Sequence, residues 1–263
     1  MSTQNRIVAF LRPNNNPLLK REHSQFREMR EFIFRPYVNR YWTMSKRLET
    51  LENHYLLVNN YLPFLNLANG ESVEIAQYDF GESILRIVMD RPKWLRREGE
   101  LGLSFFYGID RIYTAMFLIS GTHGNLQLVV GNLQGDGRDR KAIYKEFTKA
   151  MHGMRPRDFL IHVVKILGDE LGCKEILGIS DDAHRSSHWL TRAKKLSTYD
   201  EIWLEHDGIK DDASGFFKIP ARFTKRSAEE IPSKKRGLYR RRYQLLDELQ
   251  LKLRPLVKKE ASV

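Results

Sequence analysis

Five short segments between residues 72 and 135 have the alternating pattern of β-strands and are joined by very short turns. They are rich in β-branched and aromatic residues, and glycines separate them, among them Gly81, Gly99 and Gly108. Strands joined by connections this short pair with their neighbours in the sequence and run antiparallel. The sequence therefore predicts an antiparallel meander, with strands at residues 73–80, 84–90, 101–107, 112–120 and 126–133.

Two helices and a buried strand are predicted after the meander. The helices cover residues 138–151 and 157–171, and the second has Pro156 near its first turn and Gly172 after its last. Residues 176–180 form a short apolar run, which indicates a strand inside the sheet. This order predicts an α+β fold whose mixed, mainly antiparallel sheet is flanked by helices.

Helical patterns lie on both sides of this core. Two amphipathic segments flank Pro36, a residue that would break a continuous helix, and they predict an N-terminal helical layer. We therefore expect helices packed on the core over residues 1–70, an α+β core over 71–220 and a basic amphipathic helix over 221–263. The three parts are expected to form one compact unit.

The formal net charge of +11 is concentrated in the last part of the sequence. Residues 218–263 contain 14 Lys or Arg and 5 Asp or Glu, whereas the preceding 217 residues contain 30 and 28. Such a segment suits a phosphate-rich partner, either an anionic lipid surface or, less favoured because no known module is visible, a nucleic acid. The predicted partner-binding residues are Lys234, Lys235, Arg236, Arg240, Arg241 and Arg242.

The same segment carries a stripe of leucines at helical spacing. We expect the stripe to pack on the core and to leave the arginines either as a solvated face or as a contact surface. The stripe consists of Leu238, Leu245, Leu246, Leu249, Leu253 and Leu256.

Cysteine content and hydropathy restrict the class of protein and its expected location in the cell. The single cysteine, Cys173, excludes an intramolecular disulfide and a cysteine-based zinc cluster, and we expect it to be buried as a packing residue. No stretch approaches the roughly 20 apolar residues of a membrane-spanning helix. The sequence therefore predicts a cytoplasmic protein, which a lipid partner would bring to the inner membrane as a peripheral protein. It leaves the oligomeric state open.

A glycine-containing turn after the last meander strand is the predicted anion site. A strand that opens through such a turn into a helix presents backbone N–H groups to an anion. The predicted residues for a phosphate-bearing donor are Gln134, Gly135, Gly137 and Arg138. Basic residues at a helix start are unfavourable to the helix dipole, so they indicate either a bound anion nearby or a plain solvated face.

Titratable residues follow the predicted strand at 176–180. His184 has a suitable ordinary pKa for a general acid or base, and Glu201 and Tyr199 are alternatives. For each of them the competing interpretation is a hydrogen bond that orders the segment. His184 and His188 are four residues apart but lack a metal-site motif, so we expect no metal there.

The order of predicted elements is similar to the GNAT acyltransferase architecture, in which a strand, a phosphate-binding turn and a helix precede a strand that splays away. Across the whole chain the sequence resembles VirK/YbjX-type proteins of Gram-negative bacteria. That resemblance covers residues 18–250 and is carried by residues 133–135, 152–156, 178–180, 199–203, 215–220, 230–236 and 239–243.

The family resemblance implies a role in the cell envelope, namely surface-protein display, lipopolysaccharide phenotypes, resistance to cationic peptides and virulence. Two hypotheses follow from it. The chain is either an acyl- or aminoacyl-transferase that uses acyl-coenzyme A or another phosphate-bearing donor on an envelope precursor, or a non-catalytic adaptor that binds anionic lipid. The transferase hypothesis requires that the turn at residues 134–138 and the polar segment at 181–188 face one hollow.

Overall fold

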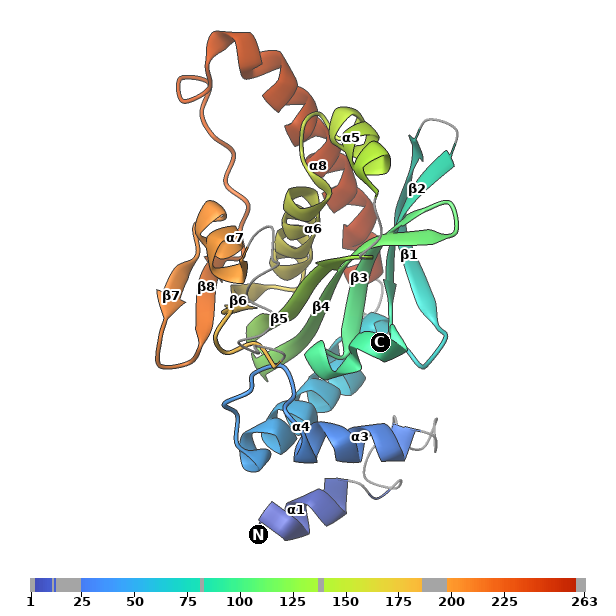
Figure 1. The fold of residues 1–263 in the computed structure, drawn as a ribbon, viewed down its shortest axis with the longest axis vertical. Helices are drawn as coiled ribbons and strands as arrows, with labels where there is room; N and C mark the ends of the chain where they lie inside the picture. The colour runs from blue at the N-terminus through green and yellow to red at the C-terminus, as the bar shows by residue number, and fades with distance from the viewer. Residues whose placement is uncertain are drawn as a thin grey trace.

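The computed structural model describes residues 3–10, 12, 25–80, 83–136, 140–185 and 198–258. Within them the chain forms an eight-stranded sheet in the order β1-β2-β3-β4-β5-β6-β8-β7 (Figure 1). The strands are β1 (Ser72–Phe80), β2 (Ser83–Asp90), β3 (Leu101–Tyr107), β4 (Asp110–Thr122), β5 (Asn125–Gly135), β6 (Cys173–Ile179), β7 (Ile209–Asp211) and β8 (Phe216–Pro220).

The predicted α+β class and the antiparallel meander are confirmed. Strands β1 to β5 pair in sequence order and antiparallel, whereas β5 and β6 are parallel and β6, β8 and β7 are again antiparallel. A parallel neighbour needs a crossover, which two helices provide here. Among the described strand pairs, β5 and β6 are therefore the one parallel pair in an otherwise antiparallel sheet.

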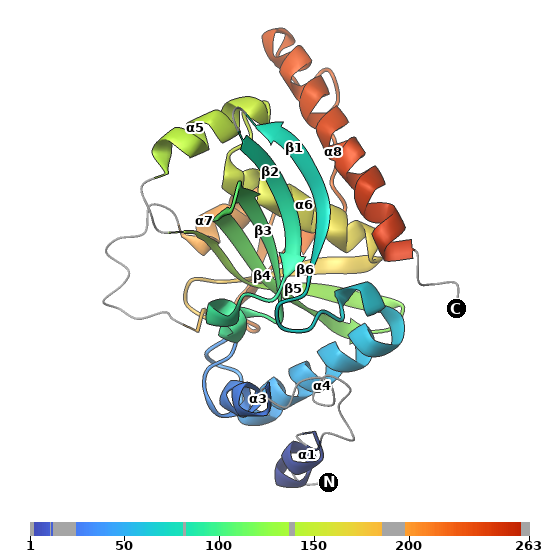
Figure 2. The same ribbon diagram turned by 90° about the vertical axis from the view of Figure 1, so that its right-hand side faces the viewer.

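Helices cover both faces of the sheet (Figures 1 and 2). One group comes from the N-terminal region, and the other consists of the crossover helices, a short helix after β6 and the long C-terminal helix. The helices are α1 (Thr3–Phe10), α3 (Gln25–Phe34), α4 (Met44–Tyr61), α5 (Lys141–Ala150), α6 (Pro156–Glu170), α7 (Tyr199–Glu205) and α8 (Arg236–Lys258), with short 3-10 helices at Pro63–Leu65, Lys93–Glu98 and Ser233–Lys235.

Alternation along the central strands divides the interior into two hydrophobic clusters. In β4, Phe117 and Ile119 belong to the cluster that includes α6 and α8, whereas Leu118 between them belongs to the cluster with the N-terminal helices. In β5, Leu128 and Val129 divide in the same way. The middle of the sheet is thus buried on both faces, which explains why its strands are almost continuously apolar.

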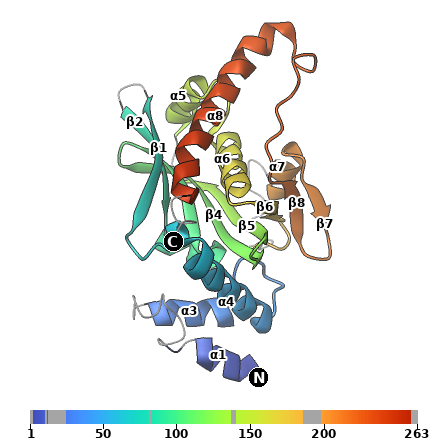
Figure 3. The same cartoon turned by 180° about the vertical axis from the view of Figure 1, so that it is seen from behind.

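Helix α8 lies across α6 and reaches β1 (Figure 3). The predicted packing of the leucine stripe is confirmed for Leu245, Leu246, Leu249 and Leu253, which are buried in the core shared with α6, and Leu256 packs partly buried against it. Leu238, at the start of the stripe, lies outside this core. A polar seam extends this contact, since Arg254 Nη2 lies 3.0 Å from Glu170 Oε1. No helix among the described residues is long and apolar enough to span a membrane.

A buried polar network attaches α4 to the sheet. The carboxylate of Glu100 is fully buried and accepts hydrogen bonds from Tyr37 (2.9 Å) and from Tyr55 of α4. The guanidinium groups of Arg91 and Arg96 lie 3.0 and 3.6 Å from the same carboxylate. Buried charges are stable only when they are compensated in this way, so the network holds the N-terminal layer in one orientation.

Candidate functional site

A large groove lies between α5, the start of α6 and the first part of α8, and we call it the basic groove. It encloses about 960 Å³ and its exposed lining is mostly apolar, contributed in part by Tyr113, Tyr144, Pro156 and Leu238. Its basic lining residues are Lys141, Lys145, Lys149, His152, Arg155, Arg157 and Arg241, and no Asp or Glu of the described chain lines it. A groove lined by both apolar surface and cations suits an amphipathic anion.

The cations of the basic groove are only partly neutralised by the protein. Arg157 is committed to Asp158 and Glu205, whereas within the described chain no ion pair involves Lys145, Lys149 or Arg155. Burial, followed by the charges of Arg241 and Arg242, lowers the pKa of His152. Burial is the larger cause, and the two arginines add to it because a like charge disfavours the protonated imidazole.

The predicted C-terminal cluster of cations divides into groups with different surroundings. Arg241 lines the basic groove, and Arg242 packs over the ring of Tyr239 and donates a hydrogen bond to the carbonyl of His152 (2.6 Å). Arg240 is exposed. Lys234, Lys235 and Arg236 are exposed outside the groove lining, and Arg236 donates to backbone carbonyls of the preceding segment.

Sequence reasoning missed the contribution of α5 to the groove. Lys141, Lys145 and Lys149 follow a spacing of four residues, which places them on one face of a helix, and that spacing could have been recognised. His152, Gly153, Arg155 and Pro156, which connect α5 to α6, also line the groove.

In the described part of the turn after β5, a basic side chain is paired with acidic side chains of the protein itself. Gln134 is exposed, and Tyr144 of α5 packs against Gly135. Arg140, at the start of α5, contacts Asp136 (2.8 Å) and Asp110 (3.1 Å). The anion expected near these basic residues is therefore supplied, for Arg140, by two aspartates. Gly137 and Arg138 lie outside the described residues.

The pairing of β5 with β6 ends at Val130 and Gly178, one residue before the end of β6, and a buried polar cluster contains Asn132 of β5. Tyr199 donates a hydrogen bond to Asn132 Oδ1 (2.5 Å), and Asn132 donates to Glu98 and to Gln134 Oε1 (3.0 Å). His184 packs against the ring of Tyr199, with 5.1 Å between ring centroids. The structure thus brings together two of the three predicted catalytic residues and one residue of the predicted turn.

This polar cluster is enclosed by its own side chains. Asn132, Glu98, His184 and Tyr199 are all buried. Burial, followed by the charge of Glu98, raises the pKa of Tyr199 far above its ordinary value, so its hydroxyl keeps its proton at neutral pH. Burial also raises the pKa of Glu98, although Arg185, 2.7 Å away, opposes the shift. Hydrogen bonds that order the segment account for these contacts, and a catalytic role stays a prediction.

Glu201 lies apart from the polar cluster and caps a helix. Its backbone N–H donates to Thr198 Oγ1 (3.2 Å), and its carboxylate accepts from the backbone N–H of Thr198 (3.0 Å). This reciprocal pair is a capping box at the start of α7. The side chain is exposed and its bonds serve the backbone.

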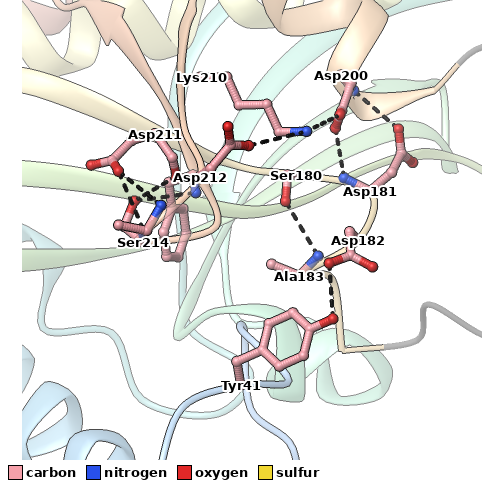
Figure 4. Close-up of polar contacts among 12 residues, drawn as sticks. Tyr41, Ser180, Asp181, Asp182, Ala183, Asp200, Lys210, Asp211, Asp212 and Ser214 are labelled. Carbon is pink, nitrogen blue, oxygen red and sulfur yellow. Dashed lines mark hydrogen bonds and ion pairs between the residues drawn. The ribbon is translucent and has the colours of Figure 1, made fainter.

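The polar segment after β6 is held by hydrogen bonds to its neighbours (Figure 4). Asp181 and Asp200 each accept the backbone N–H of the other, and Lys210 lies 3.1 Å from Asp200. Residues 181–185 form a turn and a bridge, and the Asp181 carboxylate accepts the backbone N–H of Asp200 in the first turn of α7. His188 lies outside the described residues, and the described His, Cys, Asp and Glu form no group suited to a metal ion.

The chain belongs to the DUF535 family, described as a protein of unknown function, which matches residues 2–254. The uncharacterized protein YbjX of Escherichia coli (strain K12) is 28% identical over 255 residues, or 90% of this chain and 73% of YbjX. The expected membership of the VirK/YbjX-type family is thereby confirmed.

Two uncharacterized proteins of Haemophilus influenzae match over shorter regions. They are 32% identical over 148 and 123 residues, which cover 49% and 41% of those proteins, so the matched region spans about half the length of these relatives or less. No solved structure matches the chain. The GNAT-like character of the core therefore stays a prediction.

Proposed function

We propose that this protein serves the cell envelope by binding an anionic, phosphate-bearing lipid in the basic groove, as a peripheral protein at the cytoplasmic side of the inner membrane. The observation that supports the proposal is the groove itself, a space of about 960 Å³ lined by apolar surface and by cations, of which Lys145, Lys149 and Arg155 form no ion pair in the described chain. Lysines and arginines attract anionic headgroups, and apolar surface retains the acyl part. Lipopolysaccharide phenotypes, surface-protein display, resistance to cationic peptides and virulence would all follow from handling such a lipid.

Vesicle binding tests the proposal. We expect the purified protein to co-sediment with vesicles that contain phosphatidylglycerol and not with phosphatidylcholine alone. Each groove lysine near such a surface contributes about 1 kcal/mol, so the double change Lys145→Gln and Lys149→Gln should weaken binding by about thirtyfold. Part of the wild-type binding should persist in high salt, because salt does not screen the apolar contact.

A control variant distinguishes binding in the basic groove from attraction by the overall positive charge of the protein. Lys234→Gln with Lys235→Gln removes the same charge from exposed positions outside the groove. We expect this variant to bind nearly as well as the wild type. Equal losses in the two double variants would contradict the groove as the site, and a groove variant that lost binding to a short RNA but not to vesicles would point to nucleic acid instead.

Acyl transfer is the second candidate, and it is based on the contact of His184 with Tyr199 and on the hydrogen bonds that join Tyr199 through Asn132 to Gln134. In a transferase, His184 would accept the proton of an acceptor amine or hydroxyl and the turn at Gln134 would approach the donor. We expect an acyl-coenzyme A to raise the melting temperature of such an enzyme, and His184→Ala to remove the transfer while the stabilisation by donor remains. Absence of any thermal response to acyl-coenzyme A counts against this candidate.

A further inference from the structure

A second, smaller cavity lies on the other side of the loop that bounds the basic groove. It encloses about 370 Å³ between α6, the end of α7, the segment after β8 and α8, and we call it the α6–α8 cavity. Gly153 lines both spaces. Two residues of α6, His162 and Lys165, line the cavity and lie three residues apart on the face of the helix toward α8.

Lys165 is a buried amine whose charge the protein does not balance. Its side chain is 5% exposed, and Nζ donates a hydrogen bond to the backbone carbonyl of His206 (3.1 Å). Within the described chain no carboxylate forms an ion pair with it, in contrast to the buried Arg91, which contacts Glu100. A buried ammonium without a counter-ion costs several kcal/mol, so an entering anion would stabilise it.

The carboxylates around the cavity do not supply this counter-charge. Asp158 contacts Arg157 and lies 3.7 Å from His206, and Glu205 is also paired with Arg157. Asp207 is exposed and only partly offsets the burial that lowers the pKa of Lys165. The cavity therefore retains a buried positive group at its wall.

Aromatic rings and one unsatisfied imidazole complete the lining. Phe223, Tyr239 and Tyr243 form a chain of ring contacts along one side, and His162 meets Phe223 edge to face at 4.8 Å. The buried Nδ1 of His162 has no hydrogen-bond partner in the described chain. Ring-lined walls favour a planar group, and a buried polar atom without a partner favours a ligand that supplies one.

We propose that the α6–α8 cavity binds a small molecule that carries both an oxyanion and a planar ring, with Lys165 contacting the oxyanion and Phe223, Tyr239 and Tyr243 contacting the ring. A mononucleotide has this combination and serves as the test compound. The site is separate from the basic groove and does not depend on lipid binding.

Calorimetric titration with three compounds tests the assignment: adenosine 5′-monophosphate, adenosine without the phosphate, and ribose 5-phosphate without the ring. We expect the nucleotide to bind at least tenfold more tightly than either fragment. If adenosine bound as tightly as the nucleotide, the oxyanion would contribute nothing to binding. If ribose 5-phosphate bound as tightly as the nucleotide, the ring would contribute nothing. Either result would contradict the proposal. No binding of any compound at about 5 mM, a concentration that would mostly fill a 1 mM site, would overturn the proposal.

Two substitutions check the residues. Lys165→Met keeps the shape of the side chain and removes its charge, and it should weaken nucleotide binding by at least about tenfold. Its melting temperature should be unchanged or higher, because an uncompensated buried charge is gone, so lost binding could not be ascribed to unfolding. Phe223→Leu should weaken the binding of the nucleotide but not the binding of ribose 5-phosphate, which has no planar ring to contact Phe223.

The matched control is Lys174→Met on β6, which is exposed and outside the cavity. It should bind the nucleotide as the wild type does, as should the groove variant with Lys145→Gln and Lys149→Gln. Undiminished binding by Lys165→Met would refute the role assigned to that amine.

Discussion

Replacing Glu100 with glutamine should cost this protein a large part of its stability. The substitution keeps the size of the side chain and removes the one carboxylate that Tyr37, Tyr55, Arg91 and Arg96 share. At 3.0 and 3.6 Å, and with an effective dielectric constant of about 20, each arginine attracts that carboxylate by about 5 kcal/mol. Much of this attraction offsets the cost of burying the charges.

The net loss is expected to be about 3–5 kcal/mol, because the arginines stay buried after their counter-charge has gone. For a domain near this size the melting temperature should fall by about 10 °C. Urea unfolding followed by circular dichroism at neutral pH measures the free energy, and an unchanged denaturant dependence would show that the same surface is exposed.

Glu49→Gln is the matched control, since Glu49 pairs with Lys46 on the surface of α4 and its side chain is 56% exposed. It should change the free energy of unfolding by less than about 0.5 kcal/mol. A loss below about 1 kcal/mol in Glu100→Gln would refute the reasoning, because the network would then contribute no more than a surface pair.

Two further predictions concern packing and pH. Gly178→Ala would place a methyl carbon 2.6 Å from Cδ2 of Trp203 and should lower the free energy of unfolding by about 2 kcal/mol. In the control Gly237→Ala the added methyl group has no atom within 4 Å, so urea titrations should show an unchanged or slightly higher free energy of unfolding. Burial lowers the pKa of His54, which accepts the N–H of Ile119, to about 4. Because the unfolded chain takes up this proton near pH 6.5, stability should fall by about 3 kcal/mol between pH 6.5 and 4, and His54→Gln should flatten that decline.

The parts of the fold predicted from the sequence are those whose packing leaves a periodic pattern. The meander strands are short runs rich in β-branched and aromatic residues, and they were found with nearly correct ends. Helix α8, which repeats leucine every three or four residues, was found as a helix, but it begins at Arg236 and not at residue 221. Strand β7 was missed because Ile209–Asp211 is too short and too exposed to carry a pattern. Helix α1 lies within the helical region predicted over residues 1–70 but was not recognised as a separate helix, because its eight residues include only two that are buried.

The site was less predictable, because its residues meet only through topology. The cations of α5 and α8 are about 100 residues apart in the sequence, and Lys145 and Arg241 reach one groove because α8 packs on the crossover helix α6. Buried charges were missed for another reason. A glutamate or lysine in a sequence indicates a surface position, and the burial of Glu100 and Lys165 depends on packing with residues distant in the sequence, which no local pattern reveals.

Helix α8 packs against both α6 and β1, although β1 begins at Ser72 and α8 ends at Lys258. During translation the meander can assemble from local pairings, but the face that receives Leu245 to Leu253 stays uncovered until those leucines have been synthesised. The emerging protein therefore passes through a stage with an open apolar surface, and a ribosome stalled within α8 would leave a product for chaperones and proteases.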